Sequence, residues 1–371
     1  MTEKIPDPDT YALKSAIVAD IAAPELPYQP PMPRQYRPHI GIIGAGGIVA
    51  SHLSAYRDAG WHVASICNRT IAKAESRARE FAPLAKVTDR AEDILSDPEI
   101  DVVDITPHPE DRLPLIEAAL KAGKHVLSQK PFVLDLADGR RLVQLADDKG
   151  LKLAVNQNGR WAPHLAWMRE AVRRGLIGDV VGVHVSIHWN HGWIAGTPFE
   201  NIEDLILSDF GIHWFDFLSS IIGARAEHVY ATKATAQGQK AKVPLLAQAL
   251  VSFRGGQASL VFDGATGLGG RDTSFIAGTK GSLTSDGPDL GNQTVSLTTM
   301  AGRARPKLAG TWFNDGFRGA MGALLVAIED NSEPANGARG NLDSLAMAFA
   351  AIQSSRTHQS VKIGDATRVE L

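Results

Sequence analysis

The sequence predicts an α/β protein in which a doubly wound parallel sheet precedes an α+β domain with a large, mostly antiparallel open sheet. Two observations predict this order. Between residue 39 and about residue 160, short β-rich runs alternate with helix-length segments. After residue 225, strand-like runs follow one another through glycine-rich turns without a helix between them. Alternation indicates βαβ units and a parallel sheet, whereas consecutive strands indicate antiparallel pairing.

The first domain is expected to span residues 39–160. Its strand candidates are residues 39–44, 62–67, 101–106, 125–128 and 151–156. Its helix candidates include residues 70–81, 110–123 and 135–149. Gly123 and Gly150 lie just before the next strand, which is where helix C-caps belong.

The second domain is expected to span residues 161–371. Helix candidates at 164–174 and 208–222 lie on either side of a strand at 180–189. Five further strand candidates follow, at residues 227–237, 244–253, 257–263, 273–278 and 281–286. Helices at about 314–330 and 341–356 close the chain.

Residues 1–38 form a proline-rich N-terminal arm, which holds 8 of the 20 prolines. Such density forbids a helix and favours extended polyproline geometry. Two interpretations stay open: an unattached tail, or an arm that packs on a partner subunit. Tyr28, Met32 and Tyr36 make the segment less like a tail.

Composition excludes several classes of protein. The 371 residues carry 38 basic and 41 acidic side chains, and no stretch has the dense basic run that binding a phosphate backbone requires. No apolar run is long enough for a membrane span, and the first residues lack an export signal. Cys67 is the one cysteine, which fits a reducing compartment. We expect a cytoplasmic protein without nucleic-acid or membrane partners.

The sharpest motif is the run of Gly44, Ala45, Gly46, Gly47 and Ile48, directly after the first strand and before a helix. Gly44 permits a tight turn, and Gly46 lets the backbone approach a pyrophosphate at the helix N-terminus. This context predicts a dinucleotide-binding Rossmann domain, although Val49 replaces the small residue usual at the sixth position.

The second strand ends in Cys67, Asn68 and Arg69, where this type of domain meets the adenosine ribose. An acidic residue there would bind the ribose hydroxyls, and none is present. Arg69 could pair with a 2′-phosphate, which favours NADP; it could also stack on adenine or be a solvated surface residue, so NAD stays open.

Two polar groups have the chemistry of proton transfer. Lys130 follows the strand at 125–128, which puts it on the ligand-binding edge of a parallel sheet. Asp209 and His213 lie four residues apart at the start of a helix, so both can face one cleft as an acid/base pair. Alternatively, Asp209 is a helix cap and His213 a satisfied core histidine.

Five of the seven tryptophans fall between residues 161 and 214, interleaved with histidines. Aromatic faces bind the C–H faces of sugars, so this region predicts a sugar-like ligand. Trp167 lies inside a helix and is better explained by core packing. His188 and His191 have a spacing found in metal sites, but no third ligand is evident, and we expect no metal.

The order of these motifs is similar to that of the glucose–fructose oxidoreductase / inositol dehydrogenase / rhizopine catabolism (Gfo/Idh/MocA) family. The resemblance covers nearly everything after residue 38. AGKHVLSQKP resembles the family's AGKHV-x-x-EKP, and LSDFGIHWFDFL resembles D-x-G-x-H-x-x-D; HIGIIGAGGI, RRGLIGDVVGVHV and IAGTKGSLTSD also match in order.

The resemblance implies the site. It gives catalytic roles to Lys130, Asp209 and His213, where a sugar or polyol carbon meets the nicotinamide. The expected cofactor-binding residues are Gly44, Gly46, Gly47, Ile48, Asn68, Arg69, Thr106, Pro107, His108, Gln129, Lys130, Gln157 and Asn158. The expected substrate-binding residues are Arg160, Trp161, His188, Trp193, Asp209 and His213.

The chain departs from the family pattern at two places. Gln129 replaces the family's glutamate and removes a charge beside the lysine. The turn at Thr106 and Pro107 continues with His108 and, later, Asp111, which rearranges the expected cofactor contacts.

The hypothesis is hydride transfer between NAD(P) and a hydroxyl-bearing carbon of a sugar, polyol or related carbohydrate. His213 would accept the hydroxyl proton, Asp209 would orient it, and Lys130 would stabilise the oxygen; exchanging the roles of Lys130 and His213 is equally allowed. A redox-neutral NAD-dependent glycoside-cleaving enzyme and a non-catalytic dinucleotide sensor are the alternatives. We expect a homodimer or homotetramer, assembled through the open sheet and the N-terminal arm.

Overall fold

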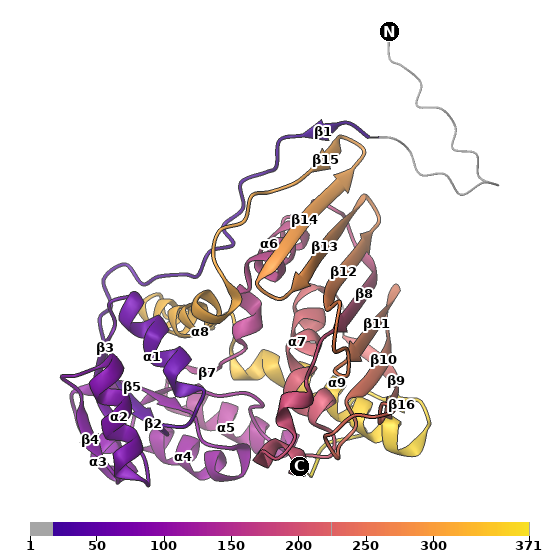
Figure 1. The fold of residues 1–371 in the computed structure, drawn as a ribbon. Helices are drawn as coiled ribbons and strands as arrows, with labels where there is room; N and C mark the ends of the chain where they lie inside the picture. Colours follow the sequence, from indigo (N-terminus) through magenta and orange to yellow (C-terminus); the bar gives the residue numbers. More distant parts are fainter. Residues whose placement is uncertain (1–17, 224, 371) are drawn as a thin grey trace.

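The fold is built on two sheets, each covered by helices (Figure 1). A computed structural model describes residues 18–223 and 225–370. The first sheet has six strands in the order β4-β3-β2-β5-β6-β7, and the second has ten in the order β1-β15-β14-β13-β12-β8-β11-β10-β9-β16. The predicted fold class, a Rossmann-type parallel sheet followed by a mostly antiparallel open sheet, is confirmed.

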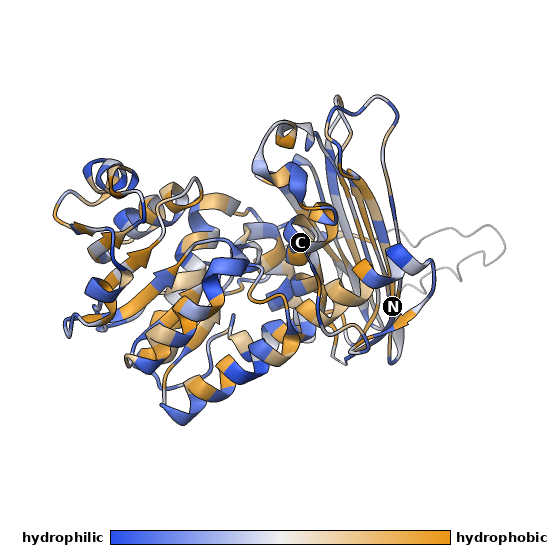
Figure 2. Ribbon diagram, turned by 90° about the horizontal axis from the view of Figure 1, so that it is seen from below, coloured by the Kyte–Doolittle hydropathy of each residue, from blue (hydrophilic) through white to orange (hydrophobic). Residues whose placement is uncertain are grey.

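All neighbouring strands of the first sheet are parallel. They are β2 (His39–Ile43), β3 (His62–Cys67), β4 (Lys86–Thr88), β5 (Ile100–Ile105), β6 (His125–Ser128) and β7 (Leu153–Val155). The helices between them are α1 (Val49–Asp58), α2 (Ile71–Phe81), α3 (Ala91–Leu95), α4 (Pro109–Lys121) and α5 (Leu136–Asp148). The strands are coloured mainly hydrophobic in Figure 2, as expected for a sheet covered on both faces.

The second sheet has one covered and one open face. Its longer strands are β8 (Val180–His188), β9 (Ala226–Ala234), β10 (Leu246–Phe253), β11 (Gly256–Asp263), β12 (Arg271–Gly278), β13 (Gly281–Asp289) and β14 (Asn292–Thr299); β15 (Gly302–Ala304) and β16 (Val361–Lys362) are short. Along β8, Val185 and Ile187 are buried whereas His184 and His188 are not, which is the alternation of a half-covered strand. The covering helices are α6 (Pro163–Arg173), α7 (Ile212–Ile221) and α9 (Ala338–Thr357).

Helix α8 (Trp312–Glu329) packs on the first sheet, although it lies near the end of the chain. Its residues Phe317, Met321 and Leu324 belong to one buried cluster with Ile40 and Ile42 of β2. Figure 1 shows α8 beside α1. The sequence places this helix in the second domain, but its apolar face completes the core of the first.

The described part of the N-terminal arm packs on its own chain. Strand β1 (Asp20–Ile21) pairs in parallel with β15, and the Glu329 carboxylate accepts N–H groups from Arg34, Gln35 and Tyr36 at 2.8, 2.6 and 2.9 Å. The unattached tail does not describe this stretch, because its backbone donors find partners on α8. Contact of the arm with a partner subunit stays a prediction. The rest of the arm, residues 1–17, lies outside the described residues.

A buried carboxyl group on β12 makes the stability of the fold depend on pH. Asp272 is 1% exposed, and within residues 18–223 and 225–370 its two carboxylate oxygens have no hydrogen-bond partner. Burial, with added repulsion from Asp289 and Asp286, raises its pKa to about 7.

Because the folded state holds this proton more tightly, stability falls as pH rises from the ordinary carboxyl pKa to about 7. The loss amounts to about 4 kcal/mol if no solvent relaxes around the charge. We expect Asp272→Asn to be more stable than the wild type at about pH 8 and similar at about pH 4 in urea unfolding. Asp365→Asn, at an exposed site, is the control; parallel pH dependences in wild type and Asp272→Asn would contradict the assignment.

Candidate active site

The glycine-rich turn lies between β2 and α1, at the carboxyl edge of the first sheet. Gly44 has a φ of +106°, and a Cβ there would lie 2.3 Å from Oγ1 of Thr106, so only glycine fits. A Cβ on Gly46 or Gly47 would meet nothing within 4 Å. The turn therefore packs closely against Thr106 at Gly44, whereas the space beside Gly46 and Gly47 is open. Helix α1, whose first turn has no acidic residue, begins immediately after Ile48.

The end of β3 supports this turn. The side-chain oxygen of Asn68 accepts the Ala45 N–H at 3.0 Å, and its amide nitrogen donates to the Thr70 carbonyl. Asn68 thus fixes the glycine turn. The Arg69 side chain is 87% exposed and pairs with Asp111 at 2.9 Å, so a carboxylate from α4 reaches the edge at which β3 itself provides no acid.

The turn after β5 frames the same edge. The Thr106 hydroxyl donates to the Ile43 carbonyl at 3.1 Å, and His108, which is exposed, precedes the first residue of α4. The buried Arg112 of α4 donates to the Pro107 carbonyl at 3.0 Å and to the carbonyls of Gln129 and Pro131. Arg112 was not among the predicted residues, yet it ties the Thr106 turn to the lysine segment.

Lys130 meets Asp209 across the two domains. Its ammonium nitrogen lies 2.9 Å from Oδ1 of Asp209 and also donates to the Asp209 carbonyl at 2.9 Å. The two side chains are only 16% and 30% exposed. Lys130 follows β6 directly, whereas Asp209 comes from a π-helical turn, Ile206–Phe210, that leads into α7.

The glycine of the D-x-G-x-H pattern has a local reason. A Cβ on Gly211 would lie 2.8 Å from the Ile206 carbonyl oxygen, so the π-helical turn leaves no room for a side chain. Single π-turns often occur at functional sites. The sequence predicts a continuous helix over 208–222; instead the turn carries Asp209 and the regular helix carries His213.

The pKa values of Asp209 and His213 are both lowered, but for different reasons. Burial alone would raise the pKa of Asp209, but the Lys130 ammonium outweighs it and lowers the pKa below its usual value. Burial, followed by the charge of Lys130, lowers the pKa of His213 to about 3 against the opposing pull of Asp209 and Asp216. His213 is therefore a neutral imidazole beside an ion pair, and its Nδ1 is buried with no partner among the described residues.

An aromatic wall stands next to the ion pair. Phe210 packs against Trp189 and His191 at ring distances of 4.0 and 5.1 Å, and Trp193 lies 5.1 Å from His191. Trp193 is 57% exposed and forms the outer part of the wall. His191 is buried, and Asp209 and Lys130 both act on its pKa, which burial lowers.

Three predicted substrate-binding residues lie elsewhere. Arg160 is held by Asp216 at 2.6 Å, and Trp161 is 4% exposed and packs against α8. His188 is on the open face of the second sheet, where it contacts Ser186 at 2.7 Å. The period-two alternation of β8 places His188 and the buried Ile187 on opposite faces of the sheet. This alternation was the sequence signal that His188 faces away from the helices.

Sequence reasoning named His191 only for its metal-like spacing and not as a site residue, because it lies in an irregular loop whose direction no periodicity fixes. Trp312 was also missed: its ring centre is 5.6 Å from that of His213, and its indole donates to the Asn158 side chain at 3.0 Å. Asn158 is thereby buried as a structural contact. Gln157 is buried too, and both of its amide atoms lack a partner within the described chain.

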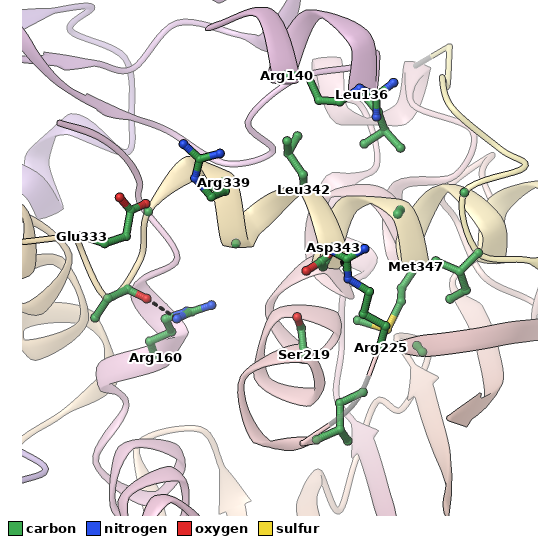
Figure 3. Close-up of a pocket in the computed structure, with 18 of the residues that line it drawn as sticks. Leu136, Arg140, Arg160, Ser219, Arg225, Glu333, Arg339, Leu342, Asp343 and Met347 are labelled. Atoms are coloured by element: carbon green, nitrogen blue, oxygen red, sulfur yellow. Dashed lines mark hydrogen bonds and ion pairs between the residues drawn. The ribbon is translucent and has the colours of Figure 1, made fainter. Parts of the chain in front are cut away.

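A separate cavity of about 1000 Å³ lies between α5, α7 and α9 (Figure 3). Arg160 lies at its edge and donates to the Ala335 carbonyl. Lys130, Asp209 and His213 do not line this cavity. Size alone therefore does not identify the reactive site.

Comparison with known proteins agrees with this geometry. A family model described as "Oxidoreductase family, NAD-binding Rossmann fold" matches residues 39–157, and one described as "GFO/IDH/MocA C-terminal domain" matches residues 165–284. The chain belongs to the Gfo/Idh/MocA oxidoreductase family. As a Gfo/Idh/MocA protein, it is an oxidoreductase with a nicotinamide-dinucleotide-binding domain.

Relatives match along most of this Gfo/Idh/MocA chain. D-apiose dehydrogenase of Paraburkholderia graminis is 26% identical over 339 residues, which cover 87% of this chain and 88% of that protein. Inositol 2-dehydrogenase of Rhizobium meliloti is 26% identical over 336 residues, covering 87% and 98%. The fold of an oxidoreductase from Agrobacterium radiobacter, in complex with NAD+, L-tartaric acid and magnesium, matches with a TM-score of 0.80 at 22% identity, covering 89% and 99%.

The residues present fit the dinucleotide that this Gfo/Idh/MocA domain implies. The open face above Gly46 and Gly47 lies at the N-terminus of α1, where N–H groups and the helix dipole favour a pyrophosphate. The unpartnered Gln157 amide offers a donor and an acceptor to a polar ring substituent. Hydride exchange is the chemistry that a bound nicotinamide supplies. No helix of the described chain has the length and apolarity to cross a bilayer.

Proposed function

We propose that this protein transfers a hydride between a nicotinamide dinucleotide and a hydroxyl-bearing carbon of a sugar, polyol or related carbohydrate. One observation carries the proposal: the Lys130 ammonium, held 2.9 Å from the Asp209 carboxylate, shares its site with the neutral imidazole of His213. A cation that binds oxygen and a base that accepts a proton are what alcohol oxidation needs.

The proposed roles follow from the charges. The substrate oxygen binds to Lys130, whose positive charge stabilises the oxygen as it loses its proton. Asp209 orients that ammonium through the 2.9 Å contact. His213 takes the proton, because its lowered pKa leaves it unprotonated, whereas Lys130 is engaged in an ion pair. The carbohydrate class is supported by the aromatic wall of Phe210, Trp189 and Trp193, which His191 joins together.

The proposal is tested with a panel of sugars, polyols and sugar lactones, following the absorbance of reduced nicotinamide. Substrate-dependent reduction of NAD+ or NADP+ is expected. Cleavage of a glycoside without added cofactor and without net absorbance change would instead establish the redox-neutral alternative. Dinucleotide binding with no turnover on the whole panel would reject the enzymatic proposal in favour of a sensor.

For the cofactor, we propose a preference for NADP that depends on Arg69. Its exposed ion pair with Asp111 is worth about 1 kcal/mol at most, so exchanging the carboxylate for a 2′-phosphate costs little. We expect Arg69→Ala to weaken NADP binding by about tenfold and to leave NAD binding within about twofold, measured by titration calorimetry. Asp111→Asn should strengthen NADP binding. Equal losses for both dinucleotides in Arg69→Ala would contradict this preference.

For assembly, we propose that two copies pair through the open face of the second sheet in a homodimer or homotetramer. This face exposes Tyr230, Leu250 and Phe275 by 41%, 57% and 41%, which is unusual for solvated strands. Light scattering of Leu250→Lys should show a smaller particle than the wild type. The arm's proposed share in assembly is tested by deleting residues 1–17, with an unchanged particle size as the refuting outcome.

A further inference from the structure

We propose that Gln129 is a positioning residue that fixes Lys130 through a buried hydrogen-bond network ending at His52 and Asp104, and that this network pairs a neutral Gln129 with a neutral His52. The inference rests on the proposed role of Lys130. It assigns a task to the position at which the chain departs from the family's glutamate.

The network begins at the backbone of the lysine. The Lys130 N–H donates to Oε1 of Gln129 at 2.7 Å, and the Asn156 amide donates to the same oxygen at 3.2 Å. Nε2 of His52 lies 3.2 Å from the Asn156 amide nitrogen and 3.4 Å from that of Gln129. Nδ1 of His52 lies 2.7 Å from Oδ2 of Asp104. Gln129 is 6% exposed, and the other side chains of the network are fully buried.

The partners fix which groups donate. A backbone N–H can only donate, so the carbonyl oxygen of Gln129 must face Lys130 and its NH₂ must face His52. The Asn156 NH₂ must then face the same ring nitrogen, because its oxygen would repel that of Gln129. Two donors therefore converge on Nε2 of His52, which has to accept. The ring proton lies on Nδ1 and is donated to Asp104, so His52 is neutral.

Asp104 accepts a second hydrogen bond. The hydroxyl of Tyr56 donates to the same carboxylate oxygen at 2.7 Å. Burial and the Asp104 charge raise the pKa of Tyr56 well above its usual value, so the phenol keeps its proton. The His52 ring also packs against Phe317, at a ring distance of 4.7 Å, and this side chain is not titratable. The network therefore has one net negative charge, on Asp104.

A glutamate at position 129 would give the network the same net charge. One carboxylate oxygen would accept the Lys130 N–H, and the other would require a proton on Nε2 of His52. The imidazolium would then lie between two carboxylates, again with one net negative charge. The replacement of glutamate by glutamine is thus matched by the loss of one proton from His52, and the net charge of the network is preserved.

The network also connects Lys130 to the cofactor-binding turn. His52 lies in the first turn and a half of α1, directly behind the glycines. On the opposite side, Arg112 donates to the carbonyls of Gln129 and Pro131. The backbone around the reactive ammonium is therefore held from both sides by buried donors and acceptors, which limits displacement of its side chain.

The first experiment compares Gln129→Met with Gln144→Met, a substitution of the same type on the exposed face of α5. Methionine removes the acceptor for the Lys130 N–H, and we expect kcat to fall by about 10- to 100-fold while the dinucleotide Kd stays within about twofold. Gln129→Glu keeps the acceptor and should recover most of this loss near neutral pH.

The second experiment needs no substrate. Nitrogen-15 NMR of histidine-labelled protein should show Nε2 of His52 unprotonated in the wild type and both nitrogens protonated in Gln129→Glu, with His52→Asn to assign the signals. A doubly protonated His52 in the wild type, a wild-type kcat in Gln129→Met, or equal losses in Gln129→Met and Gln129→Glu would overturn the inference. Failure of the whole carbohydrate panel would reject the proposed function alone, since the NMR result is independent of turnover.

Discussion

Lys130→Met is expected to lower kcat by about 10²–10³-fold, the usual loss when a preorganised donor to a developing oxyanion is removed. The ammonium is the only group in the ion pair that can stabilise that negative charge, and methionine keeps the length of the side chain without it. Dinucleotide affinity should remain, because the glycine turn and α1 are untouched. Steady-state kinetics on the best substrate of the panel and dinucleotide titration provide the two measurements.

The same variant has a distinctive pH profile. The Lys130 charge is the second cause, after burial, of the low pKa of His213, and it holds the pKa of Asp209 down. Without it, both pKa values rise. The acid limb of the remaining activity should therefore move to higher pH in Lys130→Met. The control is Lys149→Met, at an exposed helix end; turnover in Lys130→Met that matched this control would remove Lys130 from the mechanism.

His213→Asn is expected to reduce kcat by about 10²–10⁴-fold, the range for loss of a positioned general base. In the wild type, the pKa of about 3 keeps the imidazole unprotonated above that value, so titration of His213 should give no acid limb in kcat between about pH 5 and about pH 8. Pre-steady-state mixing of enzyme, dinucleotide and substrate measures whether the hydride step itself has slowed.

Asparagine keeps a polar side chain of similar size beside Trp312, so the variant should fold. The matched control is His62→Asn. His62 is exposed and lies at the first residue of β3, away from the carboxyl edge of the sheet. Partial recovery of the rate by added imidazole would identify the missing base. If His213→Asn retained wild-type turnover while Lys130→Met did not, the roles of the two groups would have to be exchanged.

Most of the fold could be predicted because the spacing of apolar residues along the sequence indicates which side chains are buried. The parallel strands follow from apolar runs such as β2, and the open sheet follows from the alternation along β8 and β10. Strands β4 and β15 were missed because each has three residues and too few side chains to show a period. Strand β14 was missed because it buries only Val295 and Leu297 among mostly polar residues. The docking of α8 could not be predicted, since an amphipathic helix does not specify which of two sheets it covers.

The site was predicted where sequence neighbours determine position. Lys130 at a strand end and Asp209 ahead of His213 are local patterns, and the structure brings Lys130 and Asp209 into contact. Arg160 and Asn68 were predicted to bind ligands, and that stays a prediction; their contacts with Asp216 and Ala45 could not be predicted, because these partners are distant in sequence. The tautomer of His52 likewise depends on Gln129 and Asn156, which only the folded chain places around it.

The docking of α8 has a consequence for synthesis on the ribosome. Because Phe317 and Met321 complete the core around Ile40, the nucleotide-binding half cannot finish folding when its own last strand emerges. It must wait, with apolar surface uncovered, until more than 150 further residues have been translated, as the interval from β7 to α8 requires. Residues 39–160 grafted alone into a chimera would lack the side chains of α8 that complete this core.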